Sequence, residues 1–335
     1  MKITIWKIFS TLFLLICISY TSGQKFVKNY DIDSLSLIHK RIPVKNDSIN
    51  FLEITKDPES GRKKDLIFFL QGSDPSPLIS EDDNGKFLLL PFDIKQLSRE
   101  NIFVVISKPK IPVYQHFKDL DDHFKIDDQK ILMSYFKYNT LQYLSDEVNL
   151  LTKIYAKDKR IRNIYVIGHS QGGRVALHIR HKKIRKIAVL SVNLFGRYEE
   201  SINRMRYEEI SGQDTTLDKK IEQEYLSYHQ LIRRTRFGDT LDDLSLRSYK
   251  TFTIPGSFTE LEKIKIPVLI AYGSNDIGVA FSNDIIRFRL AGKENFSFQV
   301  YPLMSHNFER HTQAKNENEN HWQQVFEETV TWLKK

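Results

Sequence analysis

The sequence predicts an α/β fold in which helices cover both faces of a mostly parallel, doubly wound β-sheet. Short apolar runs rich in β-branched and aromatic residues alternate with segments whose apolar residues recur every three or four positions. One run, residues 164–167, leads directly into Gly-His-Ser-Gln-Gly at 168–172 and then into a helix-like segment from Arg174. A chain of 335 residues is also long enough to bury the core that such a sheet needs.

The predicted strands are short apolar segments bounded by polar or turn-forming residues. They are residues 49–54, 65–75 (a strand that ends in a Gly/Pro loop), 102–106, 164–167, 184–192, 267–273 and 296–301. Residues 113–139 have no clear period, and we expect them to cross over the edge of the sheet. The polar tract at 315–320 is expected to be a solvated loop.

Helices are predicted where apolar residues repeat at helical spacing. A long helix before the strand at 164–167 is indicated by Leu141, Leu144, Val148, Leu151 and Tyr155. Residues 279–290 form another, and a closing helix is indicated by Trp322, Phe326, Val330 and Leu333. Residues 196–263 contain charged helical patterns and no buried strand. We therefore expect a helical cap or lid at 196–263, inserted into a core of residues 24–195 and 264–335.

The first 23 residues have the pattern of a signal peptide. Lys2 and Lys7 precede or flank a mostly apolar run at 8–20, and the small residues at 21–23 offer a cleavage site before Gln24. The run is short for a transmembrane helix. We expect the protein to be secreted or periplasmic, with no stable membrane span after cleavage. The alternative is a protein anchored to the membrane by this uncleaved segment.

Composition excludes several classes of function. The net charge of +8 is spread along the chain, whereas nucleic-acid binding favours a concentrated basic stripe, so no nucleic-acid partner is predicted. The only cysteine, Cys17, lies in the predicted signal peptide, which leaves the mature chain without a disulfide or a thiol nucleophile. An exported protein without disulfides is typical of a bacterial envelope or secreted enzyme.

A metal site is also disfavoured. His116 and His123 lie among aspartates in the segment 116–128, but the spacing matches neither an EF-hand nor H-E-x-x-H. A solvated acidic loop is the favoured interpretation, and neither a metal nor a cofactor is predicted. Nothing in the sequence indicates an oligomeric state.

The segment 168–172 has the G-x-S-x-G spacing of a nucleophile elbow, a sharp turn between a strand and a helix. The turn forces Ser170 into a strained backbone conformation, and side chains at Gly168 or Gly172 would collide with the neighbouring strand and helix. A serine hydroxyl reacts only when a base takes its proton. Asp276 and His306 follow the strands at 267–273 and 296–301, and residues after parallel strands meet at one edge of the sheet.

An oxyanion that forms at such a serine needs two hydrogen-bond donors. One is expected to be the backbone N–H of Gln171. The other is expected from the loop 71–74, Gln-Gly-Ser-Asp, with Ser73 favoured and Asp74 as the alternative.

These motifs resemble the α/β-hydrolase superfamily over residues 45–335, with Gly-His-Ser-Gln-Gly-Gly as the most specific match. The resemblance implies the α/β-hydrolase fold, with Ser170 as nucleophile, His306 as general base and then acid, and Asp276 orienting the imidazole. Gln71-Gly72 stands where many members have His-Gly, which leaves Ser73 against Asp74 open. A serine nucleophile disfavours dehalogenase and epoxide hydrolase chemistry.

The predicted activity is that of an exported serine hydrolase, a carboxylesterase-like enzyme that cleaves a small ester through an acyl-serine. Tyr, Met and Ile residues of the cap are expected to select the acyl group. One alternative is a peptidase or aminopeptidase of the same fold, in which cap glutamates hold the substrate amine: Glu199, Glu200, Glu208 and Glu209. A further alternative is a non-catalytic binding protein.

Overall fold

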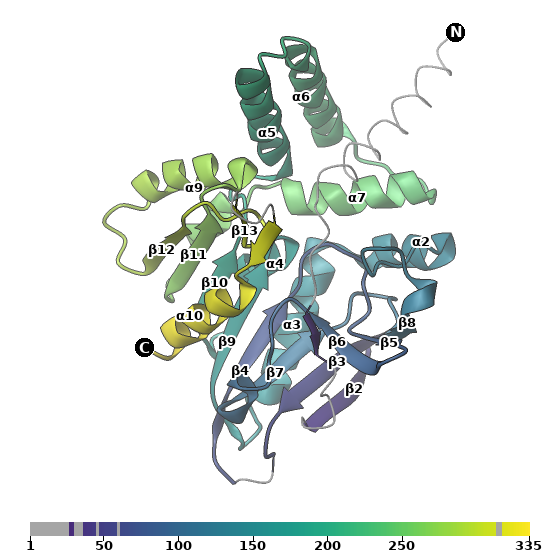
Figure 1. The fold of residues 1–335 in the computed structure, drawn as a ribbon, viewed down its shortest axis with the longest axis vertical. Helices are drawn as coiled ribbons and strands as arrows, with labels where there is room; N and C mark the ends of the chain where they lie inside the picture. The colour runs from purple at the N-terminus through teal and green to yellow at the C-terminus, as the bar shows by residue number, and fades with distance from the viewer. Residues whose placement is uncertain (1–26, 30–35, 45–46, 59–60, 313–316) are drawn as a thin grey trace.

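An eight-stranded sheet forms the centre of the computed structural model, in the spatial order β12-β11-β10-β9-β4-β7-β3-β2 (Figure 1). The structure describes residues 27–29, 36–44, 47–58, 61–312 and 317–335. The predicted signal peptide at 1–23, with Cys17, lies outside these residues.

Six neighbouring strands of this sheet, from β7 to β12 in space, run parallel, and β3 and β2 are antiparallel at one edge. Their bounds are β2 Ser36–Val44, β3 Asp47–Thr55, β4 Lys64–Leu70, β7 Asn101–Ile106, β9 Ile161–His169, β10 Ile184–Leu190, β11 Val268–Gly273 and β12 Phe296–Tyr301. The mostly parallel sheet is therefore confirmed. The edge strand β2 was not predicted.

Helices cover both faces of the sheet. They are α2 Gln129–Tyr138, α3 Leu141–Tyr155, α4 Gln171–His178, α5 Arg197–Gly212, α6 Leu217–Arg233, α7 Leu241–Thr253, α8 Phe258–Leu261, α9 Ile277–Arg289 and α10 Trp322–Lys334, with 3-10 turns η1 Leu97–Arg99 and η2 Phe117–Asp119. Leu66 and Phe68 of β4 pack in a core with α3, α4 and α9. Ile67 and Phe69, which alternate with them, pack in a second core with α10.

A second, smaller sheet lies beside the first, with the strand order β1-β6-β5-β8. Its strands are β1 Val27–Asn29, β5 Ile79–Asp82, β6 Gly85–Leu90 and β8 Tyr114–His116. The segment 113–139, expected to cross the sheet edge, supplies β8, η2 and α2.

The tract at 315–320 does not form the expected loop where the structure describes it. Its residues Glu317–Asn320 form β14, which pairs antiparallel with β13 Glu309–Thr312. Main-chain pairing holds this hairpin together, so the polar side chains that suggested a loop do not oppose it.

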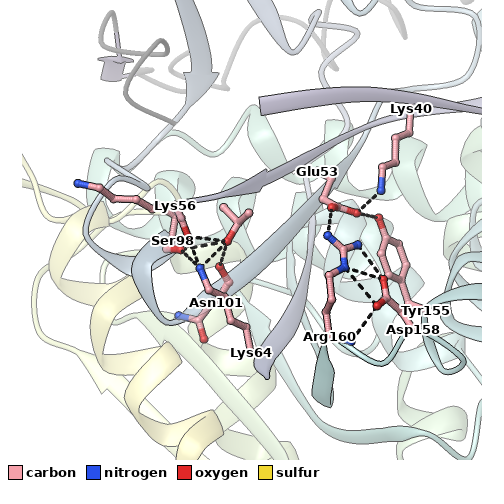
Figure 2. Close-up of polar contacts among 10 residues, drawn as sticks. Lys40, Glu53, Lys56, Lys64, Ser98, Asn101, Tyr155, Asp158 and Arg160 are labelled. Atoms are coloured by element: carbon pink, nitrogen blue, oxygen red, sulfur yellow. Dashed lines mark hydrogen bonds and ion pairs between the residues drawn. The ribbon is translucent and has the colours of Figure 1, made fainter. Parts of the chain in front are cut away.

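Two polar clusters lie at the amino-terminal ends of the parallel strands (Figure 2). In one, the buried carboxylate of Glu53 on β3 accepts from Lys40 at 2.5 Å, from the Tyr155 hydroxyl at 2.5 Å and from Arg160 at 3.0 Å. In the other, Lys64 donates to Thr55 Oγ1 at 2.9 Å. These contacts join the edge strands to α3 and to the start of β9, at the end of the sheet opposite Ser170.

Four helices, α5 to α8, occupy the span between β10 and β11 and no strand interrupts them in residues 196–263, all of which the structure describes. In Figure 1, α5 and α6 project from the sheet next to α9, and α7 lies beside α2. Treating 196–263 as a separate cap domain stays a prediction. None of the helices in the described part of the chain combines the length and apolar character needed to cross a bilayer.

Candidate active site

Ser170 occupies the turn between β9 and α4 with φ 51° and ψ −116°, a backbone conformation that a serine rarely adopts. The flanking glycines explain how the turn fits. A Cβ at Gly168 would lie 2.3 Å from the carbonyl oxygen of Gly172, and a Cβ at Gly172 would lie 2.0 Å from that of Leu70 on β4. Only glycine allows this approach of strand and helix, and the strained serine is the result that the spacing predicts.

The main chain of Ser170 is fixed on both sides. Its N–H donates to the carbonyl of Leu190 on β10 at 2.9 Å, and its carbonyl accepts from the N–H groups of Gly173 at 3.1 Å and Arg174 at 3.3 Å. Ser170 therefore stands at the carboxyl end of the central strands with its backbone held by β10 and α4.

Asp276 and His306 meet at the same edge of the sheet, from the loops after β11 and β12. His306 Nδ1 lies 2.7 Å from Asp276 Oδ2, and the Asp276 side chain is 1% exposed. The N–H of Asn275 donates to the carbonyl of Met304 at 2.9 Å, which ties the two loops together. A carboxylate is only an acceptor, so this geometry places the proton of a neutral His306 on Nδ1 and leaves Nε2 free to accept another.

The charges around His306 favour its protonated form. Burial lowers its pKa, but the negative charges of Asp276 and Glu200 outweigh burial, and the pKa is raised above its ordinary value. Ser170 and His306 line one pocket, together with the loop that contains Gly72 and Ser73. The structure therefore brings Ser170, Asp276 and His306 to one place, and their catalytic roles stay a proposal.

His169 is a supporting residue whose role the sequence did not indicate. Its buried ring lies 3.2 Å, through Nε2, from the backbone oxygen of His306, and packs at 4.8 Å from the ring of Trp322. A carbonyl oxygen only accepts, so Nε2 carries the proton. Burial, together with the charge of His306, lowers the pKa of His169 to about 3. A neutral His169 thus holds the main chain of His306 in position.

The loop 71–74 and the start of α4, which contain the two expected oxyanion donors, meet at Ser170. Gln171 is the first residue of α4, where an N–H has no partner within the helix. A Cβ at Gly72 would lie 3.7 Å from the Cβ of Ser170, so the loop 71–74 contacts the elbow. Tyr135 donates to the carbonyl of Ser73 at 2.8 Å and holds this loop. The assignment of the second donor to Ser73 stays a prediction.

Lys108, another residue that sequence reasoning missed, joins the loop 71–74 to the start of α4. Its buried Nζ donates to the carbonyl of Gln71 at 3.2 Å and to the side-chain oxygen of Gln171 at 3.3 Å. Burial lowers the pKa of Lys108 to about 8, against the opposing effect of nearby carboxylates. Its position just after β7, at the carboxyl edge of the sheet, was the available signal.

The helices between β10 and β11 contribute mainly charge to this pocket. The side chains that line it from this segment are Arg197, Glu200, Arg204 and Phe252. They stand in place of the tyrosine, methionine and isoleucine side chains that we expected, so that expectation is wrong. A charge pattern on a solvated helix and one that faces a pocket look alike in sequence, because only packing separates them.

The acidic loop near His116 and His123 has a structural explanation. Asp121 Oδ1 accepts from the backbone N–H groups of His123 and Lys125, each at 2.8 Å. Within the described ranges no three His, Cys, Asp or Glu side chains come together as metal ligands would.

Comparison with known structures identifies the fold. An acylaminoacyl peptidase of Pyrococcus horikoshii superposes with a TM-score of 0.50 at 9% identity, over 82% of this chain and 38% of that one. A protein of Klebsiella pneumoniae provisionally described as a dienelactone hydrolase superposes with a TM-score of 0.51 at 10% identity, over 90% of this chain and 99% of that one. The chain has the α/β-hydrolase fold. The fold that the sequence predicted is thereby confirmed.

Two further comparisons bear on this hydrolase fold. A puromycin-hydrolyzing peptidase of Mycobacterium tuberculosis superposes with a TM-score of 0.50 at 12% identity, over 81% of this chain and 36% of that one. The chain thus spans less than two fifths of the length of both peptidases. The family model described as "Dienelactone hydrolase family" matches residues 249–335, a stretch that contains Asp276 and His306. Comparison with proteins of curated function gives no match.

Proposed function

We propose that this protein is an exported serine hydrolase that cleaves a carboxylic ester through an acyl-serine intermediate. The observation that carries the proposal is the 2.7 Å contact between His306 and Asp276 in the pocket of the strained Ser170. The match of a hydrolase family model over residues 249–335 supports it. The proposal of export depends on the signal-peptide pattern at 1–23.

The proposed reaction has two steps. His306 Nε2 accepts the proton of Ser170 as the hydroxyl oxygen attacks the ester carbonyl, and Asp276 stabilises the imidazolium that forms. The N–H groups of Gln171 and Ser73 bind the oxyanion. His306 then gives the proton to the departing alcohol, which leaves an acyl group on Ser170. In the second step His306 accepts a proton from water as the water oxygen attacks the acyl carbonyl. The bond to Ser170 Oγ then breaks, His306 returns the proton to Ser170 Oγ, and the carboxylic acid is released.

A fluorophosphonate probe tests this proposal, because it labels only an activated serine. We expect labelling of the parent protein and none of Ser170→Ala or His306→Ala. Ser191→Ala is a matched control, since Ser191 also has a positive φ, 49°, and lines the same pocket after the neighbouring strand β10. Hydrolysis of short p-nitrophenyl esters should fall by about 10⁴-fold or more in Ser170→Ala. Labelling of Ser170→Ala equal to that of the parent would reject Ser170 as the nucleophile. A parent protein that is neither labelled nor active on esters would reject the proposal and favour a non-catalytic binding protein.

A peptidase is the second candidate, because two solved structures with this fold are peptidases. Of the four glutamates considered as amine ligands, Glu200 lines the pocket, but it lies 2.9 Å from Arg204 and 3.7 Å from Arg174. A carboxylate already paired with two arginines is a poor site for an ammonium group. We therefore favour the ester, and a panel of aminoacyl-naphthylamides compared with simple esters separates the two candidates.

A further inference from the structure

Basic residues gather at the amino-terminal ends of the parallel strands, the end of the sheet opposite Ser170. Exposed lysine or arginine side chains occur in the segments that lead into β9, β10, β11 and β12, and at the end of α10. We call these segments the basic edge and define them as residues 157–159, 182–185, 262–265, 293–294 and 334–335. They are far apart along the chain, which is why the positive charge looks evenly spread in the sequence.

The fold places these segments side by side, because β9, β10, β11 and β12 are consecutive in the sheet. Adjacent strands lie about 4.8 Å apart, so the four strand starts span only about 15 Å. The N–H of Ile187 at the start of β10 donates to the carbonyl of Pro267 before β11 at 3.1 Å. Lys186 joins α10 to this row, since its Nζ donates to the carbonyl of Trp332 at 3.1 Å. In Figure 1 the C-terminus, at the end of α10, lies on the side of the molecule away from α5 to α7.

Most of the positive charge on the basic edge has no compensating carboxylate. Asp158 pairs with Arg160 at 2.7 Å, and Lys263 pairs with a glutamate of α8 at 2.9 Å. The other acidic side chains of the basic edge, Glu262 and Glu294, are exposed. Its cations other than Lys263 are all exposed and form no ion pair with any residue that the structure describes. A surface of this charge attracts an anionic partner and repels a second copy of the chain.

Two apolar side chains project at the same end of the sheet. A helix that connects parallel strands runs back toward the strand starts, so the last turns of α3 and α9 lie at the basic edge. Ile154 in the last turn of α3 is 42% exposed, and Phe288 in the last turn of α9 is 84% exposed. Cations beside exposed apolar side chains are the combination that binds the surface of an anionic bilayer. The phosphates of a nucleic acid would match the cations but not the apolar side chains.

We propose that the basic edge binds the surface of a lipid bilayer that contains anionic lipids, with Ile154 and Phe288 entering the interface. The inference concerns where the protein is held and does not depend on the proposed hydrolase function. β9 is nine residues long, about 30 Å, so Ser170 at its far end would be held about that distance from the bilayer. The pocket would then face away from the membrane and stay open to a soluble substrate.

Binding to vesicles tests the inference. The complete chain is mixed with vesicles of phosphatidylcholine, alone or in equal parts with phosphatidylglycerol, and the bound fraction is measured by flotation. We expect binding to the anionic vesicles to be at least about tenfold stronger at about 0.1 M salt. Most of that difference should disappear at about 1 M salt, where the Debye length falls to about 3 Å. Residues 1–23 are present in every variant, so they affect all measurements equally.

Two matched double variants locate the binding surface. Lys182→Gln/Lys183→Gln should weaken binding to the anionic vesicles at least about tenfold, as expected for two lysines at a charged membrane surface. Lys219→Gln/Lys220→Gln is the control, because it removes an adjacent pair of exposed lysines from α6, with the same change in net charge. The control should bind like the parent. Circular dichroism spectra report whether each variant is folded.

A second pair of variants tests the apolar contribution. Phe288→Ser should weaken binding about tenfold, because an exposed aromatic ring no longer enters the bilayer interface. Leu226→Ser, which replaces a leucine of α6 that is 60% exposed, should bind like the parent. An equal loss of binding in Phe288→Ser and Leu226→Ser would overturn the assignment of the surface to the basic edge.

The remaining outcomes are also decisive. Absence of binding to anionic vesicles by the parent, or an equal loss in the two double variants, would overturn the inference. A duplex DNA fragment is tested in parallel, and DNA binding that requires Lys182 and Lys183 without any vesicle binding would assign the basic edge to a nucleic acid instead. Fluorophosphonate should label Ser170 equally fast in free and vesicle-bound protein, and slower labelling on vesicles would reject the proposed orientation. A parent that binds vesicles but is never labelled would contradict only the hydrolase proposal.

Discussion

Replacing Gly172 by alanine tests whether the packing at the elbow controls the nucleophile. The added Cβ would lie 2.0 Å from the carbonyl oxygen of Leu70, whereas carbon and oxygen in contact are separated by roughly 3.3 Å. Because the obstructing atom is main chain of the central strand β4, it is α4 that must shift, by about 1.3 Å. Overpacking of this kind costs about 1–3 kcal/mol of unfolding free energy. A displacement of about 1 Å at a reacting group is expected to reduce the rate about 100-fold.

Urea unfolding and the rate of fluorophosphonate labelling measure the two effects of Gly172→Ala separately. Gly212→Ala is the control, because a Cβ at Gly212, the last residue of α5, meets nothing within 4 Å. Alanine there should leave labelling unchanged and not lower stability, since it favours the helix. If Gly172→Ala unfolds at the parent's urea concentration and is labelled at the parent's rate, the steric explanation of the elbow is refuted.

Three other predictions follow from contacts around the site and the sheet. Activity should rise with pH through the raised pKa of His306, because the base works when neutral, and Glu200→Gln should move the midpoint of the kcat/KM profile to lower pH by removing a charge that favours the imidazolium. Lys108→Met should lower kcat about tenfold with a smaller change in KM, because the contacts that join Gln71 to Gln171 are lost; an equal rise in KM would indicate a different role. Glu53→Gln should lower the unfolding free energy at pH 7 by about 1–3 kcal/mol. Solvent screening reduces this loss, because the cationic partners Lys40 and Arg160 are partly exposed. Burial raises the pKa of Glu53, but the contacts with Lys40, Tyr155 and Arg160 outweigh burial and the pKa is lowered. The stability from these contacts is therefore present above the carboxyl's ordinary pKa and is lost as the pH falls through the pKa of the folded state. The difference in unfolding free energy between parent and variant should shrink in acid.

The parallel strands could be predicted because burial on both faces leaves an uninterrupted apolar run in the sequence. Residues 102–106 and 296–301, for example, match β7 and β12 to within one residue. The edge strand β2 could not, because it is partly exposed and the consecutive polar residues His39, Lys40 and Arg41 interrupt its apolar run. The hairpin of β13 and β14 was missed for a related reason, since its polar residues have no apolar period to detect.

The residues of the candidate site also fall into two groups, those that the sequence indicated and those that it did not. Ser170, Asp276 and His306 could be proposed because each follows a recognisable strand, and carboxyl ends of parallel strands converge. The supporting residues had no such signal. A buried lysine or arginine such as Lys108 or Arg174 contradicts the usual preference of charged residues for the surface, so only packing reveals it. The same applies to His169, whose contact with His306 joins positions 137 residues apart.

Arg204 reaches Asp276, and Glu200 raises the pKa of His306, although both residues belong to α5 rather than to the sheet. Exchanging the helical segment between β10 and β11 for that of another protein with this fold would therefore do more than alter which ligands fit the pocket. The surroundings of Asp276 and His306 would change at the same time. Under the proposed mechanism, chimeras that keep Ser170, Asp276 and His306 should therefore still differ in the pH at which they are most active.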